Sequence, residues 1–247
     1  MNPSPLSSDH LALLARADSP TVANVIELFD VRPRVAGYAN AALKAIYPEL
    51  PPAVGYAVTA TFRSAYPASS HDAYGGMPQL IADAQAIPAP RIVVFQDLDD
   101  PPAAATYGEV MATTFQAFGF VGLITSGAAR DIEQVRALRF PCWASGVIVS
   151  HGYNHILGGN VPVTVGGLQV NPGDLIHADA NGIVNIPHAI AAGVAELCEP
   201  FVQAEGIVLD YLRRPHPTLD GYRDAQRRMR EALAELRRRA QSLLPAH

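Results

Sequence analysis

The sequence is poor in cysteine and in charged residues, and each shortage excludes a class of protein. Its two cysteines, Cys142 and Cys198, stand in apolar settings without the spacing of metal ligands, so we interpret both as buried thiols. A net charge of −5 gives no reason to expect direct binding of nucleic acid. No apolar run approaches the roughly 20 residues of a membrane span, and the first residues lack a basic-then-apolar leader. We therefore expect a cytoplasmic protein without a membrane partner.

Apolar residues are abundant instead. They make up 49% of the 247 residues, against 17% for charged residues, which is typical of a chain that folds around a large core. Runs rich in branched and aromatic residues predict strands over Gly55–Phe62, Arg91–Phe95, Phe120–Thr125 and Pro141–Val149. Two strand pairs are predicted further on, a hairpin over Val163–Val170 and a pair around Asp179 and Gly182. Near the start, His10–Ala15 predicts a short helix, and Ser19-Pro20 predicts the cap of the next one.

One stretch combines a buried strand, a sharp turn and two adjacent charges. Phe120–Thr125 has the composition of a strand buried on both faces, and Gly127 allows a tight turn at its end. Arg130 and Asp131 follow the turn, and Ile132–Leu138 after them has apolar residues at helical spacing. The two charges therefore lie where a helix starts, at the carboxyl end of a strand, which is where open α/β sheets bind ligands.

An adjacent arginine and aspartate can play two different parts. They can form an ion pair that only holds the turn, as most such pairs do. Alternatively, Asp131 can hold a hard divalent cation while Arg130 binds a carboxylate or a developing oxyanion of a substrate.

The preceding helix favours the second interpretation. Gly108 stands at its predicted start, so the free amides of Gly108, Glu109, Val110 and Met111 would form an anion site. The Glu109 side chain adds an acceptor nearby. An amide site for a carboxylate, an arginine and a metal-holding aspartate together describe a site for a 2-oxo acid.

Several ordered motifs resemble those of one family. The sequence is similar to the RraA-like family, which includes 4-hydroxy-4-methyl-2-oxoglutarate / 4-carboxy-4-hydroxy-2-oxoadipate aldolases and the ribonuclease E activity regulator RraA. The resemblance covers roughly residues 20 to 210. It is carried by Gly108–Met111, Ser126–Asp131, Phe140–Gly146 and Asn160–Pro187.

The resemblance implies an α/β fold, a layered α/β/β/α sandwich with a central, mostly parallel sheet. Residues 1–19 would form an arm with a short helix, residues 20–212 the RraA-like domain, and residues 213–247 an added helical extension. The implied activity is cleavage of a 4-hydroxy-2-oxo acid into pyruvate and a second carbonyl compound, with oxaloacetate decarboxylation as a side activity.

The resemblance also assigns roles to single residues. Mg²⁺ or Mn²⁺ at Asp131 would polarise the 2-oxo group, Arg130 would stabilise the oxyanion, and the amides from Gly108 to Met111 would hold the carboxylate. A water on the metal, oriented by Glu109 and Glu205, is the candidate base. Family members close with a helix whose glutamate is thought to reach a neighbouring subunit's metal site, and Glu205 matches that glutamate. The implied assembly is a trimer or hexamer.

Two other functions stay open. One is a regulator that binds a ribonuclease through its surface without catalysis. The other is a different metal-dependent 2-oxo acid enzyme on the same scaffold, because the loops at residues 63–76 and 151–155 depart from the family pattern. Ser69-Ser70-His71-Asp72 could line the site or form a solvated loop, and His151 and His155 could be functional or structural.

Two further features need a structural test. Asp97, Asp99 and Asp100 follow a predicted strand, where acidic residues serve more often as turn formers than as metal ligands. The C-terminal helix has an apolar seam that predicts packing on another helix, and an oligomer contact would cover it. The seam consists of Tyr222, Gln226, Met229, Leu233, Leu236, Ala240 and Leu243.

Overall fold

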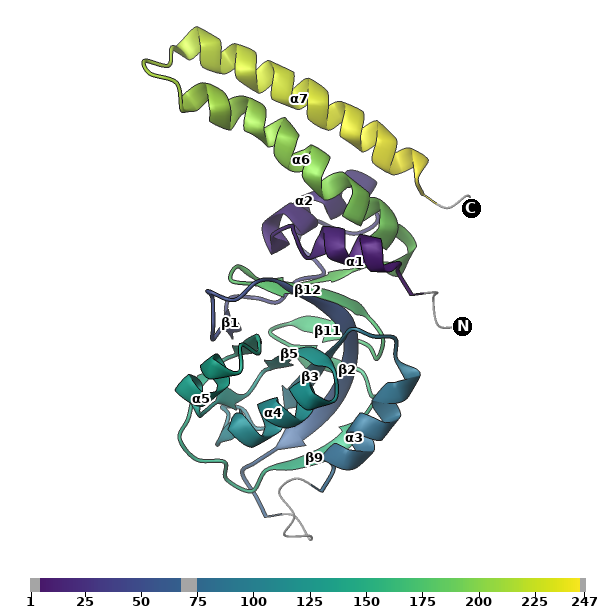
Figure 1. The fold of residues 1–247 in the computed structure, drawn as a ribbon, viewed down its shortest axis with the longest axis vertical. Helices are drawn as coiled ribbons and strands as arrows, with labels where there is room; N and C mark the ends of the chain where they lie inside the picture. The colour runs from purple at the N-terminus through teal and green to yellow at the C-terminus, as the bar shows by residue number, and fades with distance from the viewer. Residues whose placement is uncertain (1–4, 68–74, 245–247) are drawn as a thin grey trace. The chain divides into compact units, whose positions relative to one another are not determined.

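The chain forms two compact units, and the second contains segments from both ends of the sequence. The computed structural model describes residues 5–67 and 75–244 (Figure 1). The first unit contains residues 35–186, and the second joins residues 6–34 to the chain after residue 186. These divisions fall at other positions than the boundaries predicted after residues 19 and 212. Ser69, Ser70, His71 and Asp72 lie outside the described residues.

A mixed sheet forms the centre of the first unit, and the described residues contribute eight strands to it. Their order is β1-β7-β5-β3-β2-β12-β13, and β9 pairs with β2 beside this path. Pairing is parallel from β2 through β3 and β5 to β7, and antiparallel elsewhere. The expected mostly parallel sheet is thus found only in the middle. The strands are Lys44–Ala45 (β1), Ala53–Arg63 (β2), Arg91–Asp97 (β3), Phe120–Thr125 (β5), Cys142–Ala144 (β7), His155–Gly159 (β9), Leu175–Asp179 (β12) and Gly182–Ile186 (β13).

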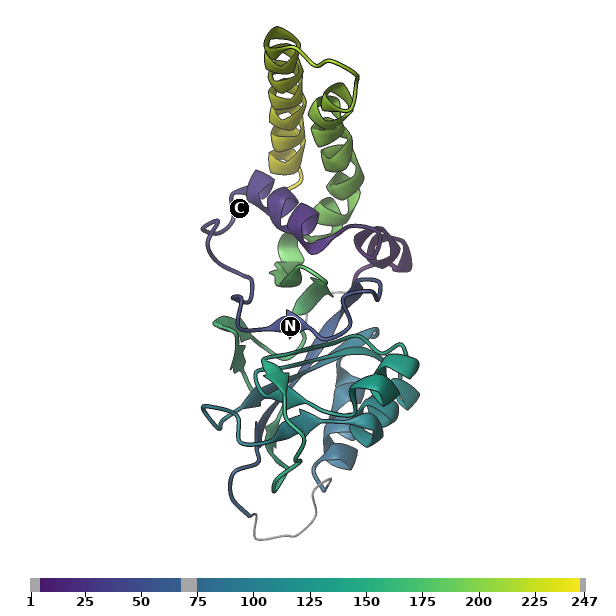
Figure 2. The same cartoon turned by 90° about the vertical axis from the view of Figure 1, so that its left-hand side faces the viewer.

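Helices cover one face of the sheet and a hairpin covers the other (Figures 1 and 2). On the helical face, the ring of Phe115 packs 6.0 Å from that of Phe95 and 4.9 Å from that of Phe120. The hairpin face is a buried apolar cluster that includes Val165, Ile92 and strand residues beside them. This layering confirms the predicted α/β class with a second β-layer. The covering elements are Met77–Asp83 (α3), Ala84–Ala86 (η1), Glu109–Ala117 (α4), Ile132–Ala137 (α5), Val163–Val165 (β10) and Leu168–Val170 (β11).

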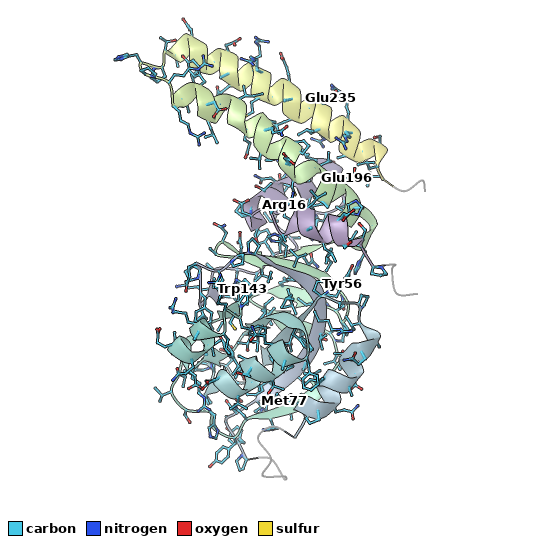
Figure 3. All side chains as sticks on the ribbon, in the orientation of Figure 1. Arg16, Tyr56, Met77, Trp143, Glu196 and Glu235 are labelled. Atoms are coloured by element: carbon cyan, nitrogen blue, oxygen red, sulfur yellow. The ribbon has the colours of Figure 1, made fainter. Side chains whose placement is uncertain are left out.

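Trp143 anchors the hairpin-side core. It is 2% exposed and lies inside the first unit (Figure 3), where its indole N–H donates to the carbonyl of Asp179 over 2.8 Å. The Asp179 carboxylate accepts from the amide of Asn181 (2.7 Å), and that of Asp174 accepts from the amide of Asn171 (2.8 Å). Both aspartates therefore serve turns.

A second, small sheet was not predicted. The strands Ala105–Tyr107 (β4), Ala128–Ala129 (β6) and Gly146–Val147 (β8) lie parallel, with β6 in the middle. The single strand predicted over residues 141–149 is therefore wrong, because β7 belongs to the large sheet and β8 to the small one. The change of sheet occurs at Ser145, whose amide and hydroxyl both donate to the carbonyl of Gly127, over 2.9 and 2.7 Å.

The second unit consists of helices, Ser8–Leu14 (α1), Ser19–Phe29 (α2), His188–Ile190 (η2), Ala191–Leu212 (α6) and Leu219–Ser242 (α7). The predicted cap of α2 is corrected. Ser19 is its first residue, and the cap is Asp18, whose carboxylate accepts from the amide of Thr21 over 2.8 Å. An aspartate at this position binds an amide that would otherwise lack an acceptor. No helix within residues 5–67 and 75–244 is long and apolar enough to cross a membrane.

Helices α6 and α7 run side by side (Figures 1 and 2). At their hairpin, the side chain of Tyr211 occupies the space that a Cβ on Gly221 would fill, so the tyrosine ring lies directly against the backbone of α7. The hydroxyl of Tyr211 in turn donates to the carbonyl of Thr218 over 3.1 Å. The packing predicted for the apolar seam of α7 is thus confirmed. Its partner is α6 of the same chain, so the seam itself gives no reason for a second subunit.

Both cysteines are free and buried, as predicted. Burial raises the pKa of the Cys198 thiol to about 12, with a smaller contribution from the Asp18 charge. Burial likewise raises the pKa of the Cys142 thiol far above its usual range. Since only the thiolate is strongly nucleophilic, neither cysteine is suited to nucleophilic catalysis at neutral pH.

Candidate active site

The candidate site lies at the carboxyl end of the small parallel sheet. Gly108 follows β4 and caps α4, which begins at Glu109 as predicted. Arg130 and Asp131 follow the middle strand β6, and Asp131 caps α5. The backbone of Asp131 is left-handed, with φ of 53° and ψ of 47°, a conformation that aspartate and asparagine adopt more readily than most residues. The chain thus passes directly from β6 into two charged side chains and a helix.

Two direct contacts join these segments. The amide of Glu109 donates to Oδ2 of Asp131 over 2.9 Å, and Nε of Arg130 lies 3.6 Å from the same oxygen. The Arg130 and Asp131 side chains are 26% and 35% exposed, so both are partly shielded but reachable from solvent. The ion pair between Arg130 and Asp131 that the sequence suggested is therefore present. It also contacts the first residue of α4, and so it does more than hold the turn after β6.

Gly108 makes this convergence possible through its lack of a side chain. A Cβ at this position would stand 2.3 Å from Oδ2 of Asp131 and 2.9 Å from Nε of Arg130. Its φ of −148° is ordinary extended backbone, so the requirement is for space and not for conformation. Glycine here allows both charged side chains to lie against the backbone at the start of α4.

The predicted anion site needs one correction. Of the amides at the start of α4, that of Glu109 already binds the carboxylate of Asp131. No atom in the described part of the chain accepts from the amides of Val110 or Met111. The Glu109 side chain is exposed beside them. Two first-turn amides, a guanidinium and an exposed carboxylate therefore remain for a ligand at this point.

Comparison with known proteins identifies the family. The model of the RraA-like family, described as Aldolase/RraA, matches residues 22–185. The chain belongs to the RraA-like family. A Halalkalibacterium halodurans protein, whose name proposes a 4-hydroxy-4-methyl-2-oxoglutarate aldolase, is 33% identical over 100 residues, which is 40% of this chain and 48% of the relative. The matched region thus spans about half the length of that curated relative.

Two solved structures share the RraA-like fold. An uncharacterised protein from Pseudomonas syringae pv. tomato has a TM-score of 0.70 and 20% identity, over 90% of this chain and 96% of the other. The Streptomyces coelicolor protein RraAS2, called an unusual member of the RNase ES inhibitor RraA family, has a TM-score of 0.64 and 22% identity, over 82% of this chain and 96% of the other. At these identities the likeness concerns the fold alone.

The remaining predicted site residues of this RraA-like chain belong to other elements. Glu205 is a half-buried residue of α6 in the second unit, whereas Arg130 and Asp131 belong to the first. His151 and His155 form hydrogen bonds through Nδ1 with carbonyls of their own loop, those of Gly152 (2.8 Å) and Tyr153 (2.7 Å). These histidine contacts are structural.

The loop that carries these histidines is anchored at the amino end of β4. The carbonyl of Ser150 accepts from the amide of Ala105 over 2.8 Å, and the side-chain amide of Asn154 donates to the carbonyl of Ala105 over 3.2 Å. Gly108 follows the other end of the same strand. The contacts of this loop with β4 therefore lie at the end of the strand away from the candidate site.

The acidic loop after β3 serves mainly as a turn. Asp99 accepts from the amides of Ser64 (2.7 Å) and Ala65 (2.9 Å), and Asp97 accepts from the amide of Asp99 (3.0 Å). Within residues 5–67 and 75–244, no three His, Cys, Asp or Glu side chains gather as a metal-binding group. The preference for turn formers over metal ligands thus agrees with the contacts of Asp97 and Asp99.

Sequence reasoning missed one residue at the candidate site, Ile148. The amide of Ile148 donates to the carbonyl of Ala129 over 3.0 Å, and the amide of Arg130 donates to the carbonyl of Tyr107 over 3.1 Å. Gly108, Arg130 and Ile148 therefore stand side by side, one position beyond the three strands. Only the register of the small sheet shows this, and strands of two or three residues leave no periodicity by which to predict it.

Asp97 provides a prediction about stability. The residue is 8% exposed, and its Oδ2 has no hydrogen-bond partner within residues 5–67 and 75–244. Burial, with a smaller contribution from the Asp99 charge, raises the pKa of Asp97 from 3.8 to about 6. Because burial favours the protonated carboxyl, Asp97 contributes its full stabilisation of the fold at pH values below its pKa in the unfolded chain. This stabilisation is lost as the pH rises to about 6.

We therefore expect Asp97→Asn to abolish this loss. Between about pH 4 and pH 7 the free energy of unfolding of the wild type should fall relative to that of the variant, by about 1–2 kcal/mol. Urea unfolding at several pH values measures the difference. Asp100→Asn, which changes an exposed carboxyl in the same loop, is the matched control and should follow the wild type. Parallel curves for the wild type and Asp97→Asn would contradict the raised pKa.

Proposed function

We propose that this RraA-like chain is a divalent-metal-dependent lyase that cleaves a 4-hydroxy-2-oxo acid into pyruvate and a second carbonyl compound. The observation that carries the proposal is the meeting of Arg130, Asp131 and the amino end of α4 over Gly108. The aldolase activity that the name of the Halalkalibacterium relative proposes agrees with this chemistry.

The start of α4 is suited to a carboxylate. It already accommodates one, since the amide of Glu109 binds Asp131. The amides of Val110 and Met111 extend the same donor group, and Arg130 adds a planar fork that can bind a carboxylate and an oxo group together. We propose that these groups hold the pyruvyl end of the substrate.

The donor set at Asp131 fits a weakly held hard cation. Mg²⁺ is usually bound through one or two carboxylates together with waters and substrate oxygens, so a single aspartate is sufficient. Only Oδ2 of Asp131 is engaged in the contacts described, and its side chain is 35% exposed. Mg²⁺ or Mn²⁺ bound there would supply Lewis acidity to the 2-oxo group.

The chain's own groups would act on the cleavage as follows. The bond between C3 and C4 breaks, the proton of the 4-hydroxyl leaves to a base, and C4 becomes the carbonyl of the departing fragment. The electron pair passes into the pyruvate enolate, whose oxygen Arg130 stabilises by hydrogen bonds. A proton then returns to C3 and gives pyruvate. Oxaloacetate decarboxylation passes through the same enolate with CO₂ as the departing fragment, so we propose it as a side activity.

The exposed carboxylate of Glu109 is the proposed acceptor of the hydroxyl proton through a water molecule. Glu205 has the role that the family resemblance implies, completion of the site of a neighbouring subunit. Its helix α6 exposes apolar side chains that suit a subunit contact, Val202 at 52%, Leu209 at 49% and Leu212 at 45%. We therefore propose a homo-oligomer, a trimer or a hexamer.

Sedimentation tests this assembly directly. We expect the wild type to sediment as a trimer or larger at micromolar concentration. Leu209→Glu should shift it toward smaller species, because a charge would replace an apolar contact, and Arg213→Glu, an exposed charge on the same unit, is the control. A wild type that remains monomeric throughout would contradict the proposal and remove the role of Glu205.

The activity is tested by pyruvate release from a panel of 4-hydroxy-2-oxo acids, with and without Mg²⁺. Metal-dependent release from at least one member supports the proposal. Turnover of another 2-oxo acid without pyruvate release would favour a different enzyme on this scaffold. If no 2-oxo acid reacts, a regulator that binds a ribonuclease becomes the better explanation, because the Streptomyces coelicolor relative is called a member of the RNase ES inhibitor RraA family.

A further inference from the structure

The small sheet sets three unlike residues, Gly108, Arg130 and Ile148, in a row at the candidate site. Residue pairs Tyr107↔Ala129 and Ala129↔Val147 lie opposite each other in its strands. One step further along each strand, Arg130 is flanked by Gly108 on one side and by Ile148 on the other. Since side chains alternate along a strand, the side chains of Arg130 and Ile148 project from the face opposite to that of Ala129 and Val147.

The two flanks of Arg130 differ. On the Gly108 side, its own Nε and Cγ and the carboxylate of Asp131 fill the space that a side chain would occupy, at 2.9, 3.0 and 2.3 Å from the position of a Cβ. That side leads to the amides of α4. The other flank has the half-buried aliphatic side chain of Ile148.

Fixed charge is scarce on the Ile148 flank. From Gly146 to Val149 the chain contains only glycine, valine and isoleucine. The ring of His151 is held by its hydrogen bond with the carbonyl of Gly152. Arg136 of α5 is committed to Glu49 and to the face of Tyr47, 5.3 Å from its ring centre. No free cation from these elements can therefore balance a second substrate carboxylate beside Ile148.

From this row we infer that Ile148 selects substrates whose departing fragment bears an apolar group where dicarboxylic substrates bear a second carboxylate. The inference rests on the proposed function, with the pyruvyl end of the substrate held at the α4 amides and C4 directed along the row toward β8. A carboxylate placed against Ile148 would lose hydration without gaining a partner, whereas a methyl group would be buried favourably.

The inference differs from what the name of the Halalkalibacterium relative proposes, because a 2-oxoglutarate derivative is a dicarboxylic acid. A matched substrate pair isolates the point. In 4-hydroxy-4-methyl-2-oxoglutarate, C4 bears a carboxylate, and in 4-hydroxy-4-methyl-2-oxopentanoate a methyl group stands in its place. The first compound gives two molecules of pyruvate, and the second gives pyruvate and acetone.

The experiment compares kcat/KM for this pair in the wild type, Ile148→Arg, Ile148→Thr and Val147→Arg. We expect the wild type to prefer the methyl compound by about 10-fold or more, the scale on which an apolar contact discriminates. Ile148→Arg should reverse the preference by providing a cation, and Ile148→Thr should reduce it. Val147→Arg adds the same charge one residue away on the opposite face, 59% exposed in the wild type, and should keep the preference.

The outcomes separate the two proposals. If neither compound nor any other 4-hydroxy-2-oxo acid yields pyruvate, the proposed function has failed and specificity has no meaning. If pyruvate forms but the wild type prefers the dicarboxylic compound, the inference is overturned while the lyase activity stands. Equal shifts of the substrate preference in Ile148→Arg and Val147→Arg would mean that any added positive charge has this effect, and they would also overturn the inference. If Ile148→Arg does not fold, an unchanged substrate preference in Ile148→Thr would overturn the inference.

Discussion

Replacing Arg130 by lysine is expected to lower turnover on the order of 100-fold while the protein stays folded, since the loss of one oxyanion donor has effects of this size. Lysine retains the charge but loses the planar fork that can bind a carboxylate and an enolate oxygen together. The fold should tolerate the change because the ion pair with Asp131 is partly exposed, and such pairs contribute little stability. Steady-state pyruvate formation and thermal unfolding of the same preparation measure the two effects.

Asp131→Asn should behave differently. Asparagine adopts left-handed backbone readily, and its side-chain oxygen can still accept from the amide of Glu109. The variant therefore loses the charge that would hold the metal and little else. We expect its activity to require more Mg²⁺ or Mn²⁺ than the wild type and to be partly restored by an excess.

Metal titrations of both variants distinguish the two interpretations of this dipeptide. An Arg130→Lys protein that unfolds, together with an Asp131→Asn protein of wild-type activity and metal dependence, would leave Arg130 and Asp131 as a structural ion pair only. The proposed lyase mechanism would then lose its centre. Loss of activity in Arg130→Lys that excess metal restores would also contradict the separate roles assigned here.

Gly108→Ala is expected to reduce activity as strongly as Arg130→Lys. The added methyl group would stand 2.3 Å from Oδ2 of Asp131 and 2.9 Å from Nε of Arg130, so both side chains must move. A displacement of about 1 Å in a catalytic group can cost on the order of 100-fold in rate. The backbone of Gly108 suits alanine, so the cost in stability should stay near the 1–3 kcal/mol typical of overpacking.

Gly146→Ala is the matched control for this substitution. Gly146 lies in β8 of the same small sheet, and a Cβ there would have no neighbour within 4 Å among the described residues. The control should keep wild-type turnover, with stability changed by less than about 1 kcal/mol. Full activity in Gly108→Ala would show that the close approach of Arg130 and Asp131 to the start of α4 is dispensable, and a global loss of folding would assign Gly108 to stability.

The parts of this molecule that could be predicted from sequence are those governed by local chemistry. The runs that became β2, β3 and β5 have enough consecutive branched residues to indicate strands, and Gly166-Gly167 marks the hairpin of β10 and β11. Gly108 and Asp131 were correctly placed at helix starts, because a glycine or an aspartate before a periodic apolar segment is a local signal.

The failures concern contacts between distant residues. The interruption at Ser145 depends on the carbonyl of Gly127, which no pattern near Ser145 reveals. The position of Ile148 beside Arg130 depends on the register of strands only two or three residues long. The seam of α7 correctly indicated helix packing, but the choice between a neighbouring subunit and α6 is not encoded in its periodicity.

The construction of the second unit from both ends of the chain determines the order in which the protein can fold during synthesis. Residues 35–186 belong to one compact unit and are continuous in sequence, so we expect this segment to fold first, because domains generally fold as units during synthesis. Helix α2 is made earlier, yet Phe29 is covered by Gly193 of α6 and Asp30 pairs with Arg237 of α7. At the usual elongation rate of 5–20 residues per second, the buried face of α2 would wait roughly 10–40 s for these partners. Val22, Val25 and Ile26 on that face are the residues that a chaperone would need to shield in the meantime.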